Sequence, residues 1–142
     1  MLRKYNVNDI NNIISLEERV LHSSLGYEHY KEDLNNRLAF HYVLENENFI
    51  GFISSIFDGE IAEVLNLGIE PLFQGNGYGY KLISKYIDEI KLLGANSIVL
   101  EVRSSNVKAI SLYEKVGFKT IRIRKKYYSN CEDALFMQKI LE

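Results

Sequence analysis

Apolar residues recur with two different periods along this chain, and the changes of period separate helices from strands. Near-helical spacing begins after Asn8 or Asp9, either of which could cap a first helix behind a brief opening strand. A second, more polar helix is predicted over residues 28–37. Strand-like runs then occupy residues 39–44, 49–57 and 60–69.

Turn residues between these runs predict how the strands pair. Asp58-Gly59 is a strong hairpin signal, so the three runs should form an antiparallel meander. Beyond a glycine-rich turn, a long helix is predicted up to Gly94, and a strongly apolar strand covers residues 97–102. This order of strand, turn, helix and strand implies one parallel crossover.

The last third of the chain is predicted to form one helix followed by two strands. Asn106 could cap a helix that ends at Gly117, and residues 118–127 and 134–141 predict a closing hairpin. No repeat, low-complexity tract or linker interrupts the chain. We therefore expect an α/β (or α+β) fold in a single domain over residues 1–142, with a mixed, mostly antiparallel sheet flanked by about four helices.

The charge and composition of the chain limit which partners, compartment and metals are expected. The formal net charge of -2 gives no global attraction to nucleic acid or to an anionic membrane, so we expect neither as a direct partner. The chain has no signal-peptide core and no apolar run of about 18 residues, which favours the cytoplasm. Its single cysteine, Cys131, cannot form an internal disulfide. His22, His29 and His41 lack the close spacing of metal ligands, so no metal is expected.

A glycine-rich turn is the most unusual feature of the sequence, and it reads Gly75-Asn76-Gly77-Tyr78-Gly79. At the start of a long helix, its backbone N–H groups and a dipole equivalent to about half an elementary charge would favour a phosphate. A P-loop or a dinucleotide fingerprint that began at Gly75 would need glycine, or in the second case alanine, where Tyr80 stands. Both motifs are excluded, and a flexible loop before a surface helix remains the alternative.

The spacing Gln74-x-x-Gly77-x-Gly79, directly after a predicted strand, resembles the turn of the GNAT superfamily of N-acetyltransferases. The resemblance implies that this turn holds the pyrophosphate of acetyl-CoA, and that the preceding strand is bulged and splays from its parallel neighbour. The N–H of Ile69 would polarise the thioester carbonyl. The implied cofactor contacts are Leu67, Gly68, Ile69, Gln74, Gly75, Asn76, Gly77, Tyr78, Gly79, Tyr80 and Asn106.

A carboxylate and a tyrosine are the candidate catalytic groups. Glu101 lies near the end of an apolar strand, where we expect it to be partly buried, and Tyr113 lies on the next helix. Attack on a thioester needs a neutral amine, yet an α-amine with a pKa of about 7.7 to 8.0 is mostly protonated at pH 7. A carboxylate could accept that proton, and a tyrosine hydroxyl could protonate the departing thiolate.

The segment 100–118 resembles the bacterial ribosomal-protein-alanine N-acetyltransferases within that superfamily. The resemblance implies that Glu101 is the base, directly or through a water, and that Tyr113 is the acid. Other interpretations stay open, since Glu101 could pair with Arg103 and Tyr113 could belong to the core. Cys131 could carry an acyl group, but direct transfer needs no such residue.

An Arg/Lys-x-Tyr-Tyr element also matches this family, which implies that Tyr127 and Tyr128 border the acceptor slot and that one of them faces the cleft. This chain has Ser24-Leu25-Gly26-Tyr27 in the region where the family often has a Pro-Trp pair, and this departure leaves the acceptor open. We expect acetyl transfer from acetyl-CoA to a primary amine, with the N-terminal α-amine of a protein, such as a ribosomal protein that starts with alanine, as the leading acceptor. The alternatives are a polyamine or aminoglycoside acetyltransferase and a non-catalytic acyl-CoA-binding sensor. The sequence does not determine the oligomeric state.

Overall fold

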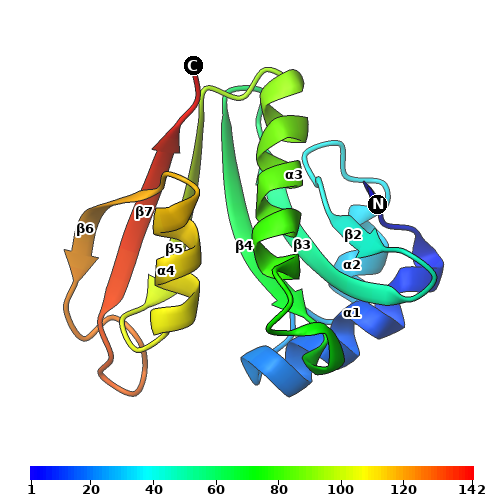
Figure 1. Ribbon diagram of the computed structural model, residues 1–142, viewed down its shortest axis with the longest axis horizontal. Helices are drawn as coiled ribbons and strands as arrows, with labels where there is room; N and C mark the ends of the chain where they lie inside the picture. The colour runs from blue at the N-terminus through cyan, green and yellow to red at the C-terminus, as the bar shows by residue number, and fades with distance from the viewer.

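The computed structural model describes residues 1–142 and arranges them around one seven-stranded sheet in the order β1-β2-β3-β4-β5-β7-β6 (Figure 1). The strands are β1 (Leu2–Lys4), β2 (Tyr42–Glu45), β3 (Phe49–Phe57), β4 (Ile61–Ile69), β5 (Ser97–Arg103), β6 (Lys119–Arg124) and β7 (Ala134–Ile140). The α-helices are α1 (Ile10–Leu16), α2 (Tyr27–Asp33), α3 (Tyr78–Leu92) and α4 (Val107–Lys115). Three short helical turns are η1 (Val7–Asp9), η2 (Glu17–Leu21) and η3 (Pro71–Phe73). The mixed sheet with its flanking helices confirms the expected fold class.

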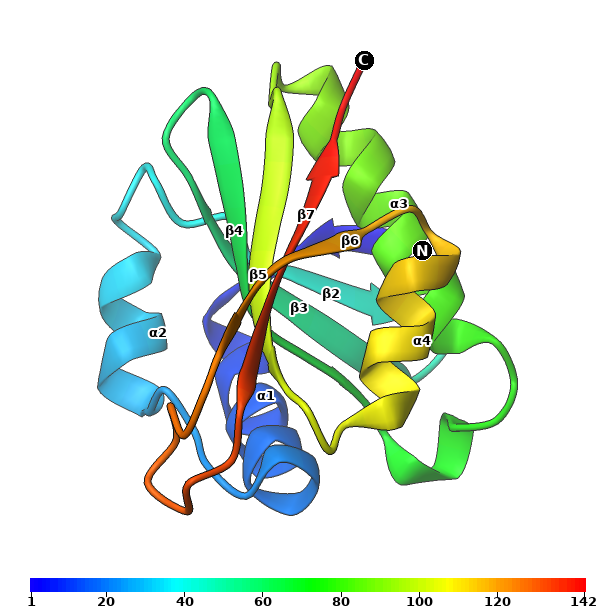
Figure 2. The same cartoon turned by 90° about the vertical axis from the view of Figure 1, so that its left-hand side faces the viewer.

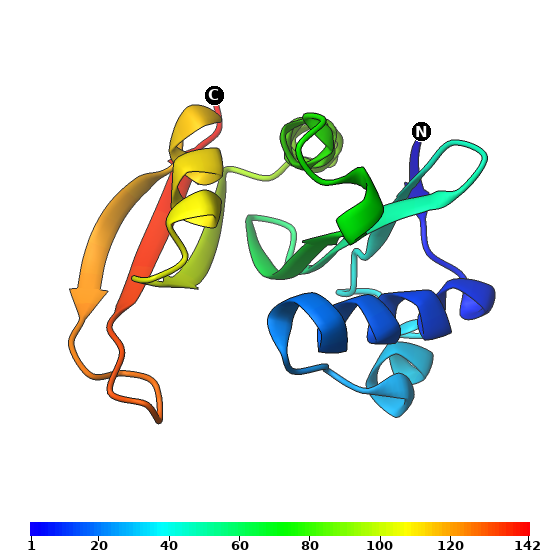
Figure 3. The ribbon, with the colours of Figure 1, turned by 60° about the horizontal axis from the view of Figure 1, so that its bottom comes forward.

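Helices cover both faces of the sheet (Figure 3). Helices α3 and α4 pack on one face, where the larger apolar cluster includes Leu82, Leu100 and Tyr113. Helices α1 and α2 lie on the other face, where Ile13 and Phe52 belong to a separate cluster. The sheet therefore has a core on each side. None of the helices combines the length and the apolar character needed to cross a membrane.

The only parallel strands in the sheet, β4 and β5, separate along their length (Figure 1). Figure 2 shows the molecule from the side of β5, β6 and β7, with α3 and α4 to one side of these strands and α2 to the other. Their pairing joins residues 61–64 to residues 97–100 and goes no further. The register between β3 and β4 shifts between Ser54 and Ser55, so Leu65 is an extra, bulged residue. A bulge bends its strand, and here it accompanies the point where β4 leaves β5. The structure thus has the splayed parallel pair that was expected.

Two helix ends differ from the prediction. Asn6, and not Asn8 or Asp9, caps the first helical turn: its side chain accepts from the Asn8 N–H at 2.9 Å, and the Asp9 carboxylate accepts from the Asn6 N–H at 2.7 Å. Asp9 therefore completes a capping box. Helix α2 ends early, at Asp33: the N–H groups of residues 34–36 bond to carbonyls three residues back, and the Asn36 side chain then accepts the Leu38 N–H in a local turn.

Strand ends and strand order also refine the prediction. Strand β2 begins at Tyr42, since Ala39 makes only an isolated bridge to Ile56. Strand β6 stops at Arg124, and Lys126 adopts a left-handed φ of 52° that turns the chain. The two C-terminal strands form the expected antiparallel pair, with β7 inserted between β5 and β6.

Close packing of β3 on β4 depends on Gly51. A Cβ at this position would lie 2.4 Å from the carbonyl oxygen of Gly68. We predict that Gly51→Ala destabilises the protein by about 1 to 3 kcal/mol, the usual cost of overpacking, as measured by urea unfolding. Gly79→Ala is the matched control, because its Cβ would meet a Leu112 methyl at 3.4 Å and Ile69 Cγ1 at 4.0 Å, which are ordinary contacts. Wild-type stability of the Gly51 variant would contradict the prediction.

Candidate functional site

A cleft of about 790 Å³ opens where β4 and β5 separate. Its walls come from the end of β4, the glycine turn, the end of β5, helix α4, and the end of η2 with the chain that follows it. Most of the residues singled out from the sequence line it. They are Leu67, Gly68, Ile69, Gln74, Gly75, Gly77, Tyr78, Gly79, Glu101, Asn106, Tyr113 and Tyr128.

Three of the expected residues have side chains elsewhere. Asn76 braces the glycine turn from outside, where its Nδ2 donates to the carbonyls of Phe73 and Gln74. Tyr80 is exposed on the surface of α3, with the Lys115 ammonium 4.7 Å from its ring centroid. Tyr127 lies outside the cleft and packs against other aromatic rings. Of the two paired tyrosines, only Tyr128 therefore faces the cleft.

The glycine turn presents a row of free backbone donors. None of the six N–H groups from Gly75 to Tyr80 donates to another protein atom, and the first bond of α3 runs from the Lys81 N–H to the Gly77 carbonyl at 3.0 Å. No side chain caps this helix, and Gly75 and Gly77 both adopt a φ of 81°. Free donors at the positive end of a 15-residue helix form a site for an anion.

The exposed edge of β4 adds donors on the other side of the turn. The Glu70 N–H bonds to the Ile50 carbonyl at 2.8 Å. In an antiparallel ladder, opposed residues alternate between bonded and non-bonded pairs, so the N–H groups of Leu67 and Ile69 point away from β3 and into the gap. The Ile69 carbonyl accepts from Gln74 Nε2 at 3.0 Å. The gap is therefore lined by donors.

Glu101 is exposed, and the expectation that it would be partly buried is wrong. Side chains alternate along β5, so Leu100 and Val102 point into the core under α3 and α4 while Glu101 points to the opposite face. Its Oε1 accepts a hydrogen bond from the Tyr128 hydroxyl at 3.1 Å. Burial and the nearby Glu101 carboxylate raise the pKa of Tyr128 to about 12.

Arg103 does not pair with Glu101. Its guanidinium makes an ion pair with Glu132 at 3.4 Å and lies 3.8 Å from the centroid of the Tyr128 ring. The Glu101 carboxylate is thus left with a tyrosine hydroxyl as its partner and an open side toward the cleft.

Tyr113 reaches the cleft from the other face of the sheet. Its ring packs edge to face against Phe118 within the larger core, and only 7% of the residue is exposed. Burial raises the pKa of the Tyr113 hydroxyl to about 12, so that it stays protonated at neutral pH. Glu101 and Tyr113 therefore border one cleft from opposite sides, through the gap between β4 and β5.

The sequence did not predict how the loop between β6 and β7 is anchored. The Glu132 carboxylate accepts from the Ser105 N–H at 2.8 Å, and the Ser104 N–H donates to the Asp133 carbonyl at 3.0 Å. The bonds from Ser105 hold the pKa of Glu132 at about 2. These contacts tie the loop that carries Tyr128 to the loop before α4. No local pattern in the sequence indicates a pairing across this distance.

Several residues that were not singled out as site residues from the sequence also line the cleft. They include Val20, Leu21, His22, Ser23, Asn66, Ser105 and Lys108. The first three belong to the π-helical turn η2 and its left-handed end, which the apolar periodicity of α1 does not reveal. Such turns often occur at functional sites.

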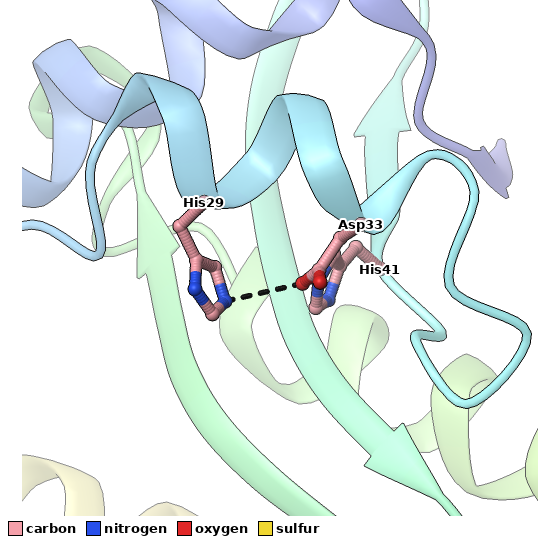
Figure 4. A group of neighbouring side chains, drawn as sticks. All are labelled: His29, Asp33 and His41. Atoms are coloured by element: carbon pink, nitrogen blue, oxygen red, sulfur yellow. Dashed lines mark hydrogen bonds and ion pairs between the residues drawn. The ribbon is translucent and has the colours of Figure 1, made fainter.

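A cluster of His29, Asp33 and His41 lies away from this cleft (Figure 4). Their ligand atoms lie within 4.8 Å of one another, although the three histidines show no metal spacing in the sequence. The His41 Nδ1 accepts from the Ser55 N–H at 3.0 Å, so its Nε2 carries the proton and donates to Asp33 at 2.7 Å. Both nitrogens of His41 are therefore engaged, and the cluster fits a structural hydrogen-bond network better than a cation site.

Comparisons with known proteins bear on this geometry. The sequence profile of the acetyltransferase (GNAT) family matches residues 7–118. The ribosomal protein bS18-alanine N-acetyltransferase of Haemophilus ducreyi is 40% identical over 98 residues, which cover 67% of this chain and 68% of that protein. The protein of the same name from Haemophilus influenzae is 42% identical over 86 residues, which cover 61% of this chain and 58% of that protein. The second match thus spans little more than half of the relative.

A solved structure resembles this chain over its full length. The crystal structure of the ribosomal-protein-S18-alanine N-acetyltransferase from Escherichia coli has a TM-score of 0.88 and 26% sequence identity. The superposition covers 100% of this chain and 94% of that chain.

Burial lowers the pKa of His41, although bonding to Asp33 opposes the shift; His29 and Glu17 are the other charged groups that act on it. An unfolded histidine binds a proton near pH 6.5, so below about that pH the unfolded state holds more protons than the folded one. We predict that the free energy of unfolding is fully retained above about pH 6.5 and falls as the pH drops below it. Thermal unfolding across this range measures the effect. His41→Gln should flatten the dependence, and an unchanged slope would contradict this.

Proposed function

This chain belongs to the acetyltransferase (GNAT) family, and on that basis we propose that it transfers the acetyl group of acetyl-CoA to the α-amine of a protein N-terminus. One observation carries the proposal. The glycine turn, whose amides from Gly75 to Tyr80 are free, lines the same cleft as the Glu101 carboxylate through Gly75, Gly77, Tyr78 and Gly79, so a site for phosphate and a candidate base share the cleft.

The diphosphate of acetyl-CoA binds to the amides of the glycine turn, to which Asn76 and Tyr80 contribute only their backbone N–H groups. The acyl arm then lies along Leu67, Gly68 and Ile69, where the Ile69 N–H donates to the thioester carbonyl. A donor that strengthens its bond to the developing oxyanion stabilises the transition state by about 3 kcal/mol. Gln74 holds the Ile69 carbonyl, and Asn106 contacts the cofactor from the start of α4.

The acceptor amine enters on the face of the sheet where Glu101 is exposed. Glu101 takes a proton from the ammonium, directly or through a water, and the amine nitrogen attacks the thioester carbon. The carbon–sulfur bond breaks, and the thiolate leaving group takes the proton of the Tyr113 hydroxyl. The second proton that the nitrogen loses as the amide forms restores the Tyr113 hydroxyl through solvent, and Glu101 releases its own proton to water. The Tyr113 hydroxyl carries its proton at neutral pH and borders the same cleft as Glu101, which supports this assignment.

The acceptor is the N-terminus of a protein, and a ribosomal protein that begins with alanine is the leading candidate. Relatives named for that activity share about 40% identity with this chain, and Tyr128 stands beside the base as a ring with a hydroxyl suited to a peptide backbone. Such an acceptor is made in the cytoplasm, where we propose that the enzyme acts.

A panel of acceptors tests the proposal. Purified protein is incubated with acetyl-CoA and with peptides that begin with alanine, the same peptides with blocked N-termini, polyamines and aminoglycosides. Release of CoA should occur with the free peptides and not with the blocked ones. Activity on the small amines alone would contradict the proposal, and binding of acetyl-CoA without any transfer would favour a sensor.

Glu101→Gln tests the base. We predict a fall in turnover of about 100-fold or more, with affinity for CoA retained, because the amide cannot accept the ammonium proton. Glu63→Gln is the matched control, since Glu63 is exposed on β4 and lies outside the cleft. Wild-type turnover in the Glu101→Gln variant would show that Glu101 is not the base.

Tyr113→Phe tests the acid. The ring keeps its packing against Phe118, so stability should change little while kcat falls by about 100-fold. The pH dependence of kcat in the wild type should show no loss from deprotonation of Tyr113 below about pH 10, given its pKa of about 12. An undiminished kcat in the variant would assign Tyr113 to the core alone.

A further inference from the structure

Glu17 is a completely buried carboxylate on the acceptor side of the cleft. It is the first residue of η2, its exposed fraction is 0%, and it forms no ion pair with any basic side chain. An unpaired buried charge is costly unless hydrogen bonds compensate for it. The bonds that Glu17 receives therefore indicate what its burial achieves.

Three neutral groups donate to this carboxylate. The Tyr30 hydroxyl donates to Oε2 at 2.7 Å, and the Ser24 hydroxyl donates to Oε1 at 2.8 Å. Asn66 Nδ2 also donates to Oε2. Ser24 lies in the loop that places Ser23 in the cleft, and Asn66 itself lines the cleft. Glu17 thus joins the two walls of the acceptor entrance.

The charge of Glu17 determines which end of the Asn66 amide faces the cleft. An ionised carboxylate only accepts hydrogen bonds, so the NH₂ group of Asn66 must face Glu17. Its Oδ1 makes no hydrogen bond within the protein. This oxygen is a free hydrogen-bond acceptor on β4. It lies next to the bulged Leu65, on the face of the sheet from which Glu101 projects.

We propose that Asn66 binds the acceptor amine: its Oδ1 accepts an N–H of the incoming ammonium and holds that nitrogen between the base and the thioester. Glu17 acts as a positioning residue, because it fixes the orientation of the amide. This inference rests on the proposed function and deepens it, since it assigns to the site a group that recognises a primary amine.

Two variants separate recognition from structure. Asn66→Leu removes the amide oxygen that would accept the hydrogen bond, while the volume of the side chain stays nearly constant. Glu17→Gln presents an NH₂ group of its own, which allows the Asn66 amide to reverse and turn a donor toward the ammonium. Glu18→Gln is the matched control, because Glu18 is exposed beside Glu17 on the same turn. Thermal unfolding and CoA affinity show whether each variant keeps its fold.

Calorimetry in the presence of CoA compares a peptide that begins with alanine and the same peptide with propionyl in place of alanyl, which lacks only the amine. The wild type and Glu18→Gln should bind the amine peptide about 10-fold more tightly or better. In Asn66→Leu and Glu17→Gln the two peptides should bind about equally, with CoA affinity within about twofold of the wild type.

A folded Asn66→Leu variant that keeps the full preference for the amine would overturn the inference, and a folded Glu17→Gln variant that keeps it would overturn the positioning role of Glu17. So would a loss of affinity for both peptides in equal measure, which indicates a structural role. Failure of the proposed function is distinguishable from failure of this inference, because the wild type itself would then not acetylate the free peptide.

Discussion

The separation of β4 from β5 is the constraint on which the rest of the structure depends. Parallel pairing stops after residues 64 and 100, so the last part of β4 has backbone N–H groups without a strand partner. The same separation opens the sheet between its two cores. A group on the α3 and α4 face, such as Tyr113, and a group on the opposite face, such as Glu101, can then border one cleft.

Local chemistry made much of the fold predictable, and with it the glycine turn that lines the cleft. Apolar periodicity located most helices and strands, and the glycine turn was recognisable because its spacing is contiguous in sequence. Positive φ at Gly75 and Gly77 and the absence of a side-chain cap on α3 are consequences of that same short segment. The family resemblance extended these local signals to the bulge and to the splayed strands.

Tertiary arrangement was less predictable. An apolar strand such as β5 does not reveal which of its faces a helix covers at each end, so Glu101 was expected to be partly buried and is exposed. Likewise, the choice between Tyr127 and Tyr128 depends on how the β6–β7 loop is anchored by Glu132. The carboxylate of Glu17 meets Asn66 across 49 positions, and no local pattern encodes that contact.

The central claim is that the free amides of the glycine turn grip a diphosphate while the thioester lies in the β4–β5 gap. Nuclear magnetic resonance measures this directly, by following each backbone amide during titration with CoA. The largest shift changes are expected at residues 75–80, with a second group at Leu67 and Ile69. Saturable binding that leaves these amides unperturbed, or no binding at all, would contradict it.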